Sequence, residues 1–488
     1  MEPSGSDSAA RNTFYSLLVR LTGAAFTAGT TLFLLRALGP EEFGLLSLAL
    51  ALVTLVSFPV DLGISQSTAR FVAESRGDPR ASAAVLGDAI KLKLAVAGSL
   101  NLALFAAAGP IARAYGDERL TWPIRAMAIA FAAQSLMLLI TYAFIAQGKI
   151  VANLRIVALE SACETAATVA LVLIGFGVVG AAFGRAAGYV IGAAFAIAVA
   201  TRWLGRGLLS FRAPARAQVR RLAGYAGVLT IIDFAWVVLG QMNALLVGAF
   251  MGTASVGLFQ APSRLIMLLG LPGLAISEGV APRLARSRDS EPDTGALVLA
   301  MRYLLLLEVL LIIPLVVWPG PVAGLALGSD YGDSASVLRA LVPFVFLSGF
   351  APVLSIAVNY LGEARRRVPV AVATVIVNVA VGIVLIPTIG IVGAAIAADL
   401  AFLLYVGGHF WICRSSLGFD AVPLAVSAGR AFLAGLAMAA MMLAVGTSDL
   451  SALAWVGGLA LGIATYAAAL VATGELTQAD LSRLRVRR

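Results

Sequence analysis

Four arginines lie inside long apolar segments, where a charge is costly. These are Arg20, Arg185, Arg264 and Arg430. A charge at the centre of a bilayer costs about 2.5 to 3.5 kcal/mol, so each arginine needs a partner or a water-filled cavity. A guanidinium stays charged and binds phosphate oxygens in a bidentate manner. We therefore predict phosphate contacts for Arg20, Arg264 and Arg185, with structural pairing or snorkelling as the alternative, and we expect Arg430 to snorkel.

Carboxylates form a second set within these segments. Asp233 shares a helical face with Gln241, and Glu160 and Glu164 are one turn apart. Such groups can carry protons, coordinate sodium or neutralise the arginines, and neutralisation is the favoured role for any single one. The candidates for ion coupling or charge balance are Asp61, Glu160, Glu164, Asp233, Glu308 and Asp399. Further candidates for substrate contact are Thr27, Gln241 and Asn243.

The sequence gives little support for a metal site, a cofactor site or a catalytic site. The single histidine, His409, has no nearby set of ligands, so we expect no metal site. The sequence contains no Walker loop, and we expect no cofactor. A membrane glycosyltransferase, polymerase or ligase would need a sizeable outer loop with acid–base residues, whereas the longest outer loops here have about fifteen residues. We therefore predict no catalytic residues and a protein that is not an enzyme.

The elements that carry these residues are membrane-spanning helices. The chain is 60% hydrophobic and only 12% charged, while soluble domains carry about 25% charged residues. A helix of about 20 apolar residues crosses a bilayer, and the apolar runs have that length without strict alternation. We predict an all-α polytopic protein of about 14 transmembrane helices, at residues 13–36, 42–62, 84–108, 123–146, 152–175, 178–201, 223–250, 255–281, 298–318, 334–361, 368–388, 390–412, 424–446 and 451–473.

Positive charge is distributed unevenly between the predicted loops. Most of the 35 Lys and Arg residues lie in the two tails and the even-numbered loops. By the positive-inside rule, both termini are cytoplasmic. The net charge of +9 then reflects topology and attraction to anionic membrane lipids, and we expect no nucleic-acid binding. The first residues lack a basic n-region, so no cleaved signal peptide is evident.

The chain contains an internal repeat. A shift of 213 positions places Gly39 on Gly252 and Gly177 on Gly390. We interpret the chain as an N-lobe of six helices (1–210), a cytoplasmic linker (211–222), a C-lobe of six helices (223–415), and two further helices with a basic tail (416–488). The same shift places Pro59 on Pro272, so these prolines are candidate hinges at equivalent depths.

Two segments resemble a known family. LGPEEFGLLSLALALVTLVSFPVDLGISQSTARFVAES (38–75) resembles the N-terminal signature of the polysaccharide-export (O-antigen type) flippases, and QMNALLVGAFMGTASVGLFQAPSRL (241–265) resembles their seventh and eighth helices. The family belongs to the superfamily of multidrug, oligosaccharidyl-lipid and polysaccharide exporters. The resemblance implies two six-helix lobes around a central cavity that opens alternately to each side. It also implies a cavity-facing role for Arg264.

The resemblance implies translocation of a polyprenyl-pyrophosphate-linked oligosaccharide across the bacterial cytoplasmic membrane, as part of polysaccharide biosynthesis. Expected partners are that glycan, membrane lipids, H⁺ or Na⁺, and a polysaccharide polymerase and glycosyltransferases. A lipid II flippase is the nearest alternative. A cation-coupled multidrug exporter is disfavoured because arginines match or outnumber acids in the predicted cavity, and a scaffold that transports nothing would not need buried arginines.

Overall fold

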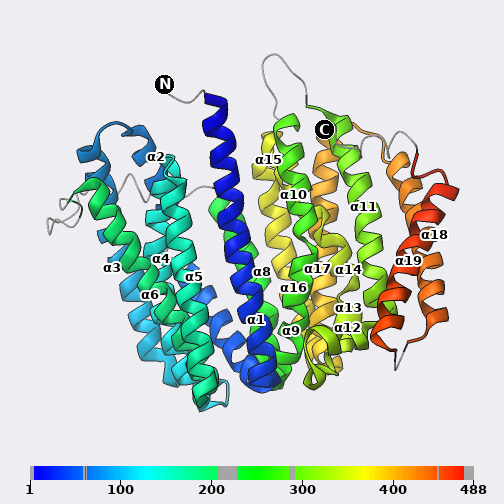
Figure 1. Ribbon diagram of the computed structural model, residues 1–488, viewed down its shortest axis with the longest axis horizontal. Coiled ribbons are helices and arrows are strands. Elements are labelled where there is room, and N and C mark those ends of the chain that lie inside the picture. The colour runs from blue at the N-terminus through cyan, green and yellow to red at the C-terminus, as the bar shows by residue number, and fades with distance from the viewer. Residues whose placement is uncertain are drawn as a thin grey trace. The chain divides into compact units, whose positions relative to one another are not determined.

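The computed structural model describes residues 5–58, 61, 63–205, 208, 228–284, 292–447 and 450–477. Helices joined by short turns make up these ranges, and no strand is found in them, as the sequence predicts (Figure 1). The chain divides into two compact units, Met1–Gly257 and Leu258–Arg488. We describe each unit separately.

The first unit contains α1 (Gly5–Ser57), α2 (Ile64–Glu74), α3 (Pro79–Ala114), α4 (Thr121–Ala146), α5 (Ile150–Leu171), α6 (Gly177–Leu204) and α8 (Val228–Met251). In this unit α6 packs against both α5 and α4, α4 packs against α3, and α1 contacts α5 and α8 (Figure 1). Helix α9 (Thr253–Leu269) begins at the end of this unit and continues into the second.

The second unit contains α10 (Leu271–Val280), α11 (Thr294–Val317), α12 (Pro319–Ala326), α13 (Ser334–Ala340), α14 (Val342–Ser348), α15 (Phe350–Tyr360), α16 (Arg367–Ile389), α17 (Ile391–Leu417), α18 (Val422–Val445) and α19 (Ala452–Ala472). Here α16 packs against α17, and α18 packs against both α11 and α19.

Among the described residues, eleven helices are long and apolar enough to cross a membrane, or twelve if α9 and α10 form one bent span. This count does not confirm the expected fourteen. Two of the eleven segments, Leu21–Ser57 and Ile150–Leu204, are 37 and 55 residues long, and both contain a break. Helix α1 breaks at Gly39, whose φ of 69° is accessible to glycine, and Pro40 follows. These breaks lie at the junctions that the sequence predicts.

Positive-φ glycines recur at the spacing of the repeat. Gly39 and Gly252 are 213 positions apart and have φ values of 69° and 84°. Gly177 and Gly390, with φ values of 51° and 70°, have the same spacing. The backbone thus breaks at equivalent points in the two halves of the sequence, which is what an internal repeat predicts.

Two predicted segments differ from the structure. The expected single helix at 334–361 is divided into α13, α14 and α15. The break at Leu341 has a local cause, because Pro343 follows within the first turn of α14 and lacks a backbone N–H. The expected loop after residue 62 contains α2, whose buried face includes Ile64, Phe71 and Val72.

Candidate functional site

A stripe of glycines on α6 brings α5 close to it. A Cβ atom on Gly188 would lie 2.5 Å from the Cβ of Glu164, and one on Gly184 would lie 2.5 Å from the Cα of Thr168. Small residues at this spacing let two helix backbones approach closely. As a result, the polar face of α5 that carries Glu164 and Thr168 lies directly against α6.

An ion pair joins the two helices at this contact. Nη1 of Arg185 on α6 lies 3.1 Å from Oε1 of Glu164 on α5, and the two side chains are 27% and 18% exposed. The guanidinium also lies 5.3 Å from the ring centroid of Tyr189. Nε2 of Gln134 on α4 donates a hydrogen bond of 2.9 Å to the Tyr189 hydroxyl. Three helices therefore fix the position of one half-buried cation.

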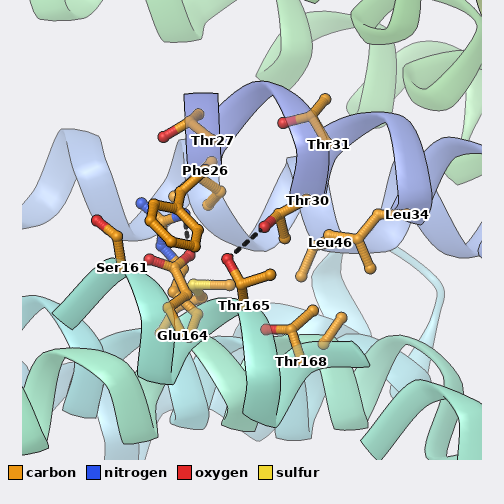
Figure 2. Close-up of a pocket in the computed structure, with 14 residues that line it drawn as sticks. Phe26, Thr27, Thr30, Thr31, Leu34, Leu46, Ser161, Glu164, Thr165 and Thr168 are labelled. Carbon is orange, nitrogen blue, oxygen red and sulfur yellow. Dashed lines mark hydrogen bonds and ion pairs between the residues drawn. The ribbon is translucent and has the colours of Figure 1, made fainter. Parts of the chain in front are cut away.

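A small cavity of about 70 Å³ adjoins this ion pair. Figure 2 shows Thr30 on α1 pointing toward Thr165 on α5, and their hydroxyl oxygens are 2.8 Å apart. A buried water needs at least about 10–15 Å³, so the cavity can hold a few waters or one small cation, and it is too small for a sugar. Its lining residues are Phe26, Thr27, Thr30, Thr31, Leu34, Leu46, Leu50, Met127, Ser161, Glu164, Thr165, Thr168, Ala181 and Arg185.

Unsatisfied polar atoms gather beside the cavity. Among the described residues, Oε1 of Glu160, Nε of Arg185 and Oγ1 of Thr168 are buried without a hydrogen-bond partner. The other carboxylate oxygen of Glu160 accepts a hydrogen bond of 3.0 Å from Ser161 Oγ. Buried polar atoms are normally bonded to protein or water, so this cluster is chemically suited to hold water, a proton or a small cation.

The structure brings together part of the predicted set. Thr27, Glu164 and Arg185 line the cavity, and Glu160 lies one turn from Glu164 on α5. The Arg20 side chain lies outside the described residues. Arg264 is half-buried on α9, in the second unit. The candidates on α8, which are Asp233, Gln241 and Asn243, do not line this cavity; Asp233 is exposed, Gln241 is half-buried and Asn243 is buried.

The predicted acids of the second unit occupy two different environments. Glu308 on α11 is completely buried, and in the described part of the chain neither carboxylate oxygen has a hydrogen-bond partner. Asp399 on α17 accepts a hydrogen bond of 2.9 Å from the backbone N–H of Phe344 in the first turn of α14. Asp399 therefore caps a helix, while Glu308 has no comparable partner.

The sequence did not reveal the partner of Asp61. Lys93, on α3, is 1% exposed and forms an ion pair with Asp61. Asp61 Oδ1 also accepts a hydrogen bond of 3.1 Å from Ser65 N in the first turn of α2. Arg70, nearer to Asp61 in the sequence, pairs with Glu74. No local pattern points to Lys93, because the two partners are 32 positions apart and lie on different elements.

Arg430 does not simply snorkel. Its Nη1 lies 3.2 Å from Oε2 of Glu475, just beyond the end of α19. Arg302 on α11 approaches the other carboxylate oxygen at 2.6 Å, and Ser427 Oγ donates to that same oxygen at 2.7 Å. Glu475 thus ties α11 to the last two helices.

The structure describes one of the two candidate hinge prolines. Pro59 lies outside the described residues. Pro272 is the second residue of α10, just after the break where α9 and α10 meet at 41°. A proline in the first turn fits such a break, because its missing N–H would have no intrahelical partner there.

Comparison with known proteins identifies relatives. The family described as "Polysaccharide biosynthesis protein" matches residues 9–288. The "Probable flippase AglR" of Haloferax volcanii is 25% identical over 253 residues, which cover 49% of this chain and 50% of that protein. The chain therefore spans about half the length of this curated relative.

Solved structures share the fold. A structure of "Lipid II flippase MurJ, inward closed conformation" has a TM-score of 0.74 at 13% identity, with coverage of 94% of this chain and 98% of that one. An inward-facing multidrug resistance MATE family transporter of the MOP superfamily has a TM-score of 0.66 at 17% identity, with coverage of 82% and 98%. At these identities the likeness concerns the fold alone.

Proposed function

Because this chain belongs to the polysaccharide biosynthesis protein family, we propose that it is a flippase that moves a polyprenyl-pyrophosphate-linked oligosaccharide across the bacterial cytoplasmic membrane. The observation that carries the proposal is the family match, which covers residues 9–288 of a multi-pass helical protein. Both termini are cytoplasmic in this proposal, as the distribution of basic residues favours.

The proposed mechanism is alternating access by two lobes, 1–210 and 223–415, that are joined by the linker 211–222, with 416–488 as an appendage. Pro59 and Pro272 are the proposed hinges. Transporters built from two related halves commonly work by moving one half against the other. In support of this proposal, the glycine breaks recur at the spacing of the repeat.

In this mechanism Arg20 and Arg264 bind the diphosphate, and Gln241 and Asn243 contact the substrate. The cavity of the first unit has a different proposed role, because about 70 Å³ can accept only water or a small ion. There, Glu160 and Glu164 take up H⁺ or Na⁺, while Arg185 balances the charge of Glu164. Asp61, Asp233, Glu308 and Asp399 are proposed to serve in ion coupling or charge balance elsewhere in the chain. A polymerase and glycosyltransferases are the proposed partners.

Reconstitution into liposomes tests the proposal. The full chain would be given a lipid-linked oligosaccharide, and the appearance of the sugar on the opposite leaflet would be followed with a lectin. We expect translocation by the wild type, a loss of about tenfold or more in Arg264→Ala, and partial activity in Arg264→Lys, since lysine keeps the charge without the bidentate geometry. Arg414→Ala, which removes an exposed arginine at the end of α17, is the matched control.

Two results would overturn parts of this proposal. If correctly inserted wild-type protein moves no lipid-linked sugar, the flippase assignment fails. If all three Arg264 proteins bind and move the sugar equally, the diphosphate contact at Arg264 fails while the flippase assignment stands. Lipid II and a cationic drug, offered in parallel, would show whether one of the alternative substrates is preferred.

A further inference from the structure

A second cavity, of about 470 Å³, lies in the first unit where α4 passes into α5 and where α6 ends. Its lining includes Lys149 and Arg155, together with the aromatic rings of Tyr15, Phe144 and Trp203. None of its lining residues is acidic. The cavity is within the common size range of sites for small ligands, roughly 300–1,000 Å³, and its lining combines positive charge with aromatic surface.

Among the described residues, the two cations at this cavity have no acidic partner. Both side chains belong to exposed residues, and among the described residues neither makes an ion pair. Five other basic residues of the same unit are paired with carboxylates: Arg70 with Glu74, Lys91 with Asp88, Lys93 with Asp61, Arg119 with Glu41 and Asp117, and Arg185 with Glu164. Positive charge at this cavity is therefore available to an anion.

Aromatic packing holds Lys149 in place. Its Nζ lies 4.9 Å from the ring centroid of Trp203, which stacks at 5.3 Å on Phe144. Lys149 also occupies the N-cap position of α5, where no side chain caps the helix. The positive end of the helix dipole therefore adds to the charge of the two side chains.

The surroundings suit a lipid better than a soluble anion. Apolar side chains beside the cavity remain exposed, with Val151 at 40% and Ile145 at 48%. Tyr and Trp are enriched where a membrane protein meets the headgroup region. The loop between α4 and α5 is expected on the cytoplasmic side, where anionic lipids attract basic residues.

We propose that the groove lined by Lys149, Arg155 and Trp203 binds the phosphate group of an anionic membrane lipid. Two lipids share this chemistry: a phospholipid with a phosphodiester headgroup and the polyprenyl diphosphate carrier. Binding of the phospholipid does not depend on the proposed flippase function, whereas binding of the carrier rests on it.

Lipid binding to the purified full-length protein tests this site. Phosphatidylglycerol would be titrated into delipidated protein in detergent, and binding would be counted by native mass spectrometry, with phosphatidylcholine as the neutral lipid. We expect the double variant Lys149→Gln/Arg155→Gln to bind phosphatidylglycerol about 30-fold more weakly, which corresponds to about 1 kcal/mol for each basic side chain near a membrane surface. Arg202→Gln, an exposed arginine in the last turn of α6 outside the cavity lining, is the matched control and should bind normally.

Fluorescence provides a second, independent measurement of lipid binding at this groove. Brominated phosphatidylglycerol should quench Trp203, and the signal is obtained by subtracting the emission of Trp203→Phe from that of the wild type, which has six tryptophans. Equal binding of both lipids, or equal quenching in the double variant, would overturn the proposal.

Competition separates the possible ligands. If polyprenyl diphosphate displaces phosphatidylglycerol at much lower concentration, the groove is a site for the carrier. If polyprenyl diphosphate does not displace phosphatidylglycerol, the groove is a phospholipid site. If inorganic pyrophosphate displaces the phospholipid as well as the carrier does, the lipid assignment is wrong. None of these outcomes requires translocation, so failure of this proposal is distinguishable from failure of the flippase proposal.

Discussion

Two acids, Glu164 in the first unit and Glu308 in the second, lie in different environments. In the first unit, Glu164 pairs with Arg185 beside a cavity that can hold water. In the second, Glu308 is completely buried, and no donor or cation contacts its carboxyl group in the described part of the chain. An isolated buried charge is very costly, while a paired and hydrated one is tolerated. The first environment can therefore hold a charged carboxylate at rest, and the second offers a negative charge no stabilisation.

At both Glu164 and Glu308, a glycine lets neighbouring backbone pack closely against the acid. In the first unit this glycine is Gly188, on the stripe of α6. In the second, a Cβ atom on Gly349 would lie 1.8 Å from Oε1 of Glu308, and one on Gly273 would lie 2.2 Å from the carbonyl oxygen of Gly349. Close backbone packing is therefore common to the two sites. What distinguishes Glu164, among the described residues, is its ion pair with Arg185, because no cation pairs with Glu308 there.

The largest expected effect comes from separating α5 and α6. In Gly188→Val the new side chain would overlap the backbone and Cβ of Glu164, so we expect a loss of about 3 kcal/mol or more of stability, or no folded protein. Thermal unfolding followed by size-exclusion chromatography measures this. Gly98→Val on α3 is the control, because a Cβ there would meet no atom within 4 Å. Equal stability of the two variants would contradict the close contact.

Removal of one partner of the ion pair should have the next largest effect. Glu164→Gln leaves Arg185 without its carboxylate, and we expect a loss of about 1–3 kcal/mol, less than for a fully dry pair because both side chains are partly exposed. The double variant Glu164→Gln/Arg185→Gln should recover much of this loss. A double-mutant cycle of unfolding free energies measures the coupling. Additive losses would show that the pair contributes no interaction energy.

The ion pairs of Glu475, an acid of the second unit, make a contribution to stability that depends on pH. Burial raises its pKa, but the hydrogen bonds from Arg302, Ser427 and Arg430 lower it more, so the net shift of the pKa is downward. A carboxyl with a depressed pKa in the folded state stabilises the protein above its unfolded pKa of about 4.3, and this stability is lost as the pH falls through the folded pKa.

We therefore expect Glu475→Gln to destabilise the protein at pH 7 and to lose less additional stability than the wild type between about pH 5 and pH 3. Unfolding at a series of pH values measures both slopes. Asp420→Asn, which changes an exposed acid before α18, serves as the control. Identical slopes for Glu475→Gln and the wild type would exclude Glu475 as a source of the acid sensitivity.

Local sequence patterns predicted much of the fold, because helix length, glycine breaks and glycine stripes are local properties. The junctions near Gly39 and Gly390 follow from the sequence. The pairing of charges could not be predicted in the same way. Lys93 lies within the predicted span 84–108, yet nothing near it in the sequence indicates that it is buried against an acid from another element. Glu475 lies beyond the last span, where nothing local indicates two arginine partners.

The smallest expected effect on stability, and the sharpest test of the comparison, is Glu308→Gln. Glutamine keeps the shape of the side chain and removes its ability to ionise. Because no cation or donor among the described residues pairs with the carboxyl group, we expect the free energy of unfolding to change by less than about 1 kcal/mol, clearly less than for Glu164→Gln. Glu308→Ala should cost about 2 kcal/mol or more, since it leaves a void at the contact with Gly349.

If Glu308 couples transport to an ion, Glu308→Gln will fold normally while sugar translocation no longer responds to a proton or sodium gradient across the liposome. If translocation responds to the gradient as in the wild type, the role of Glu308 is confined to packing. A loss of stability as large as that of Glu164→Gln would mean that a cation does balance Glu308. The contrast between Glu164 and Glu308 would then disappear.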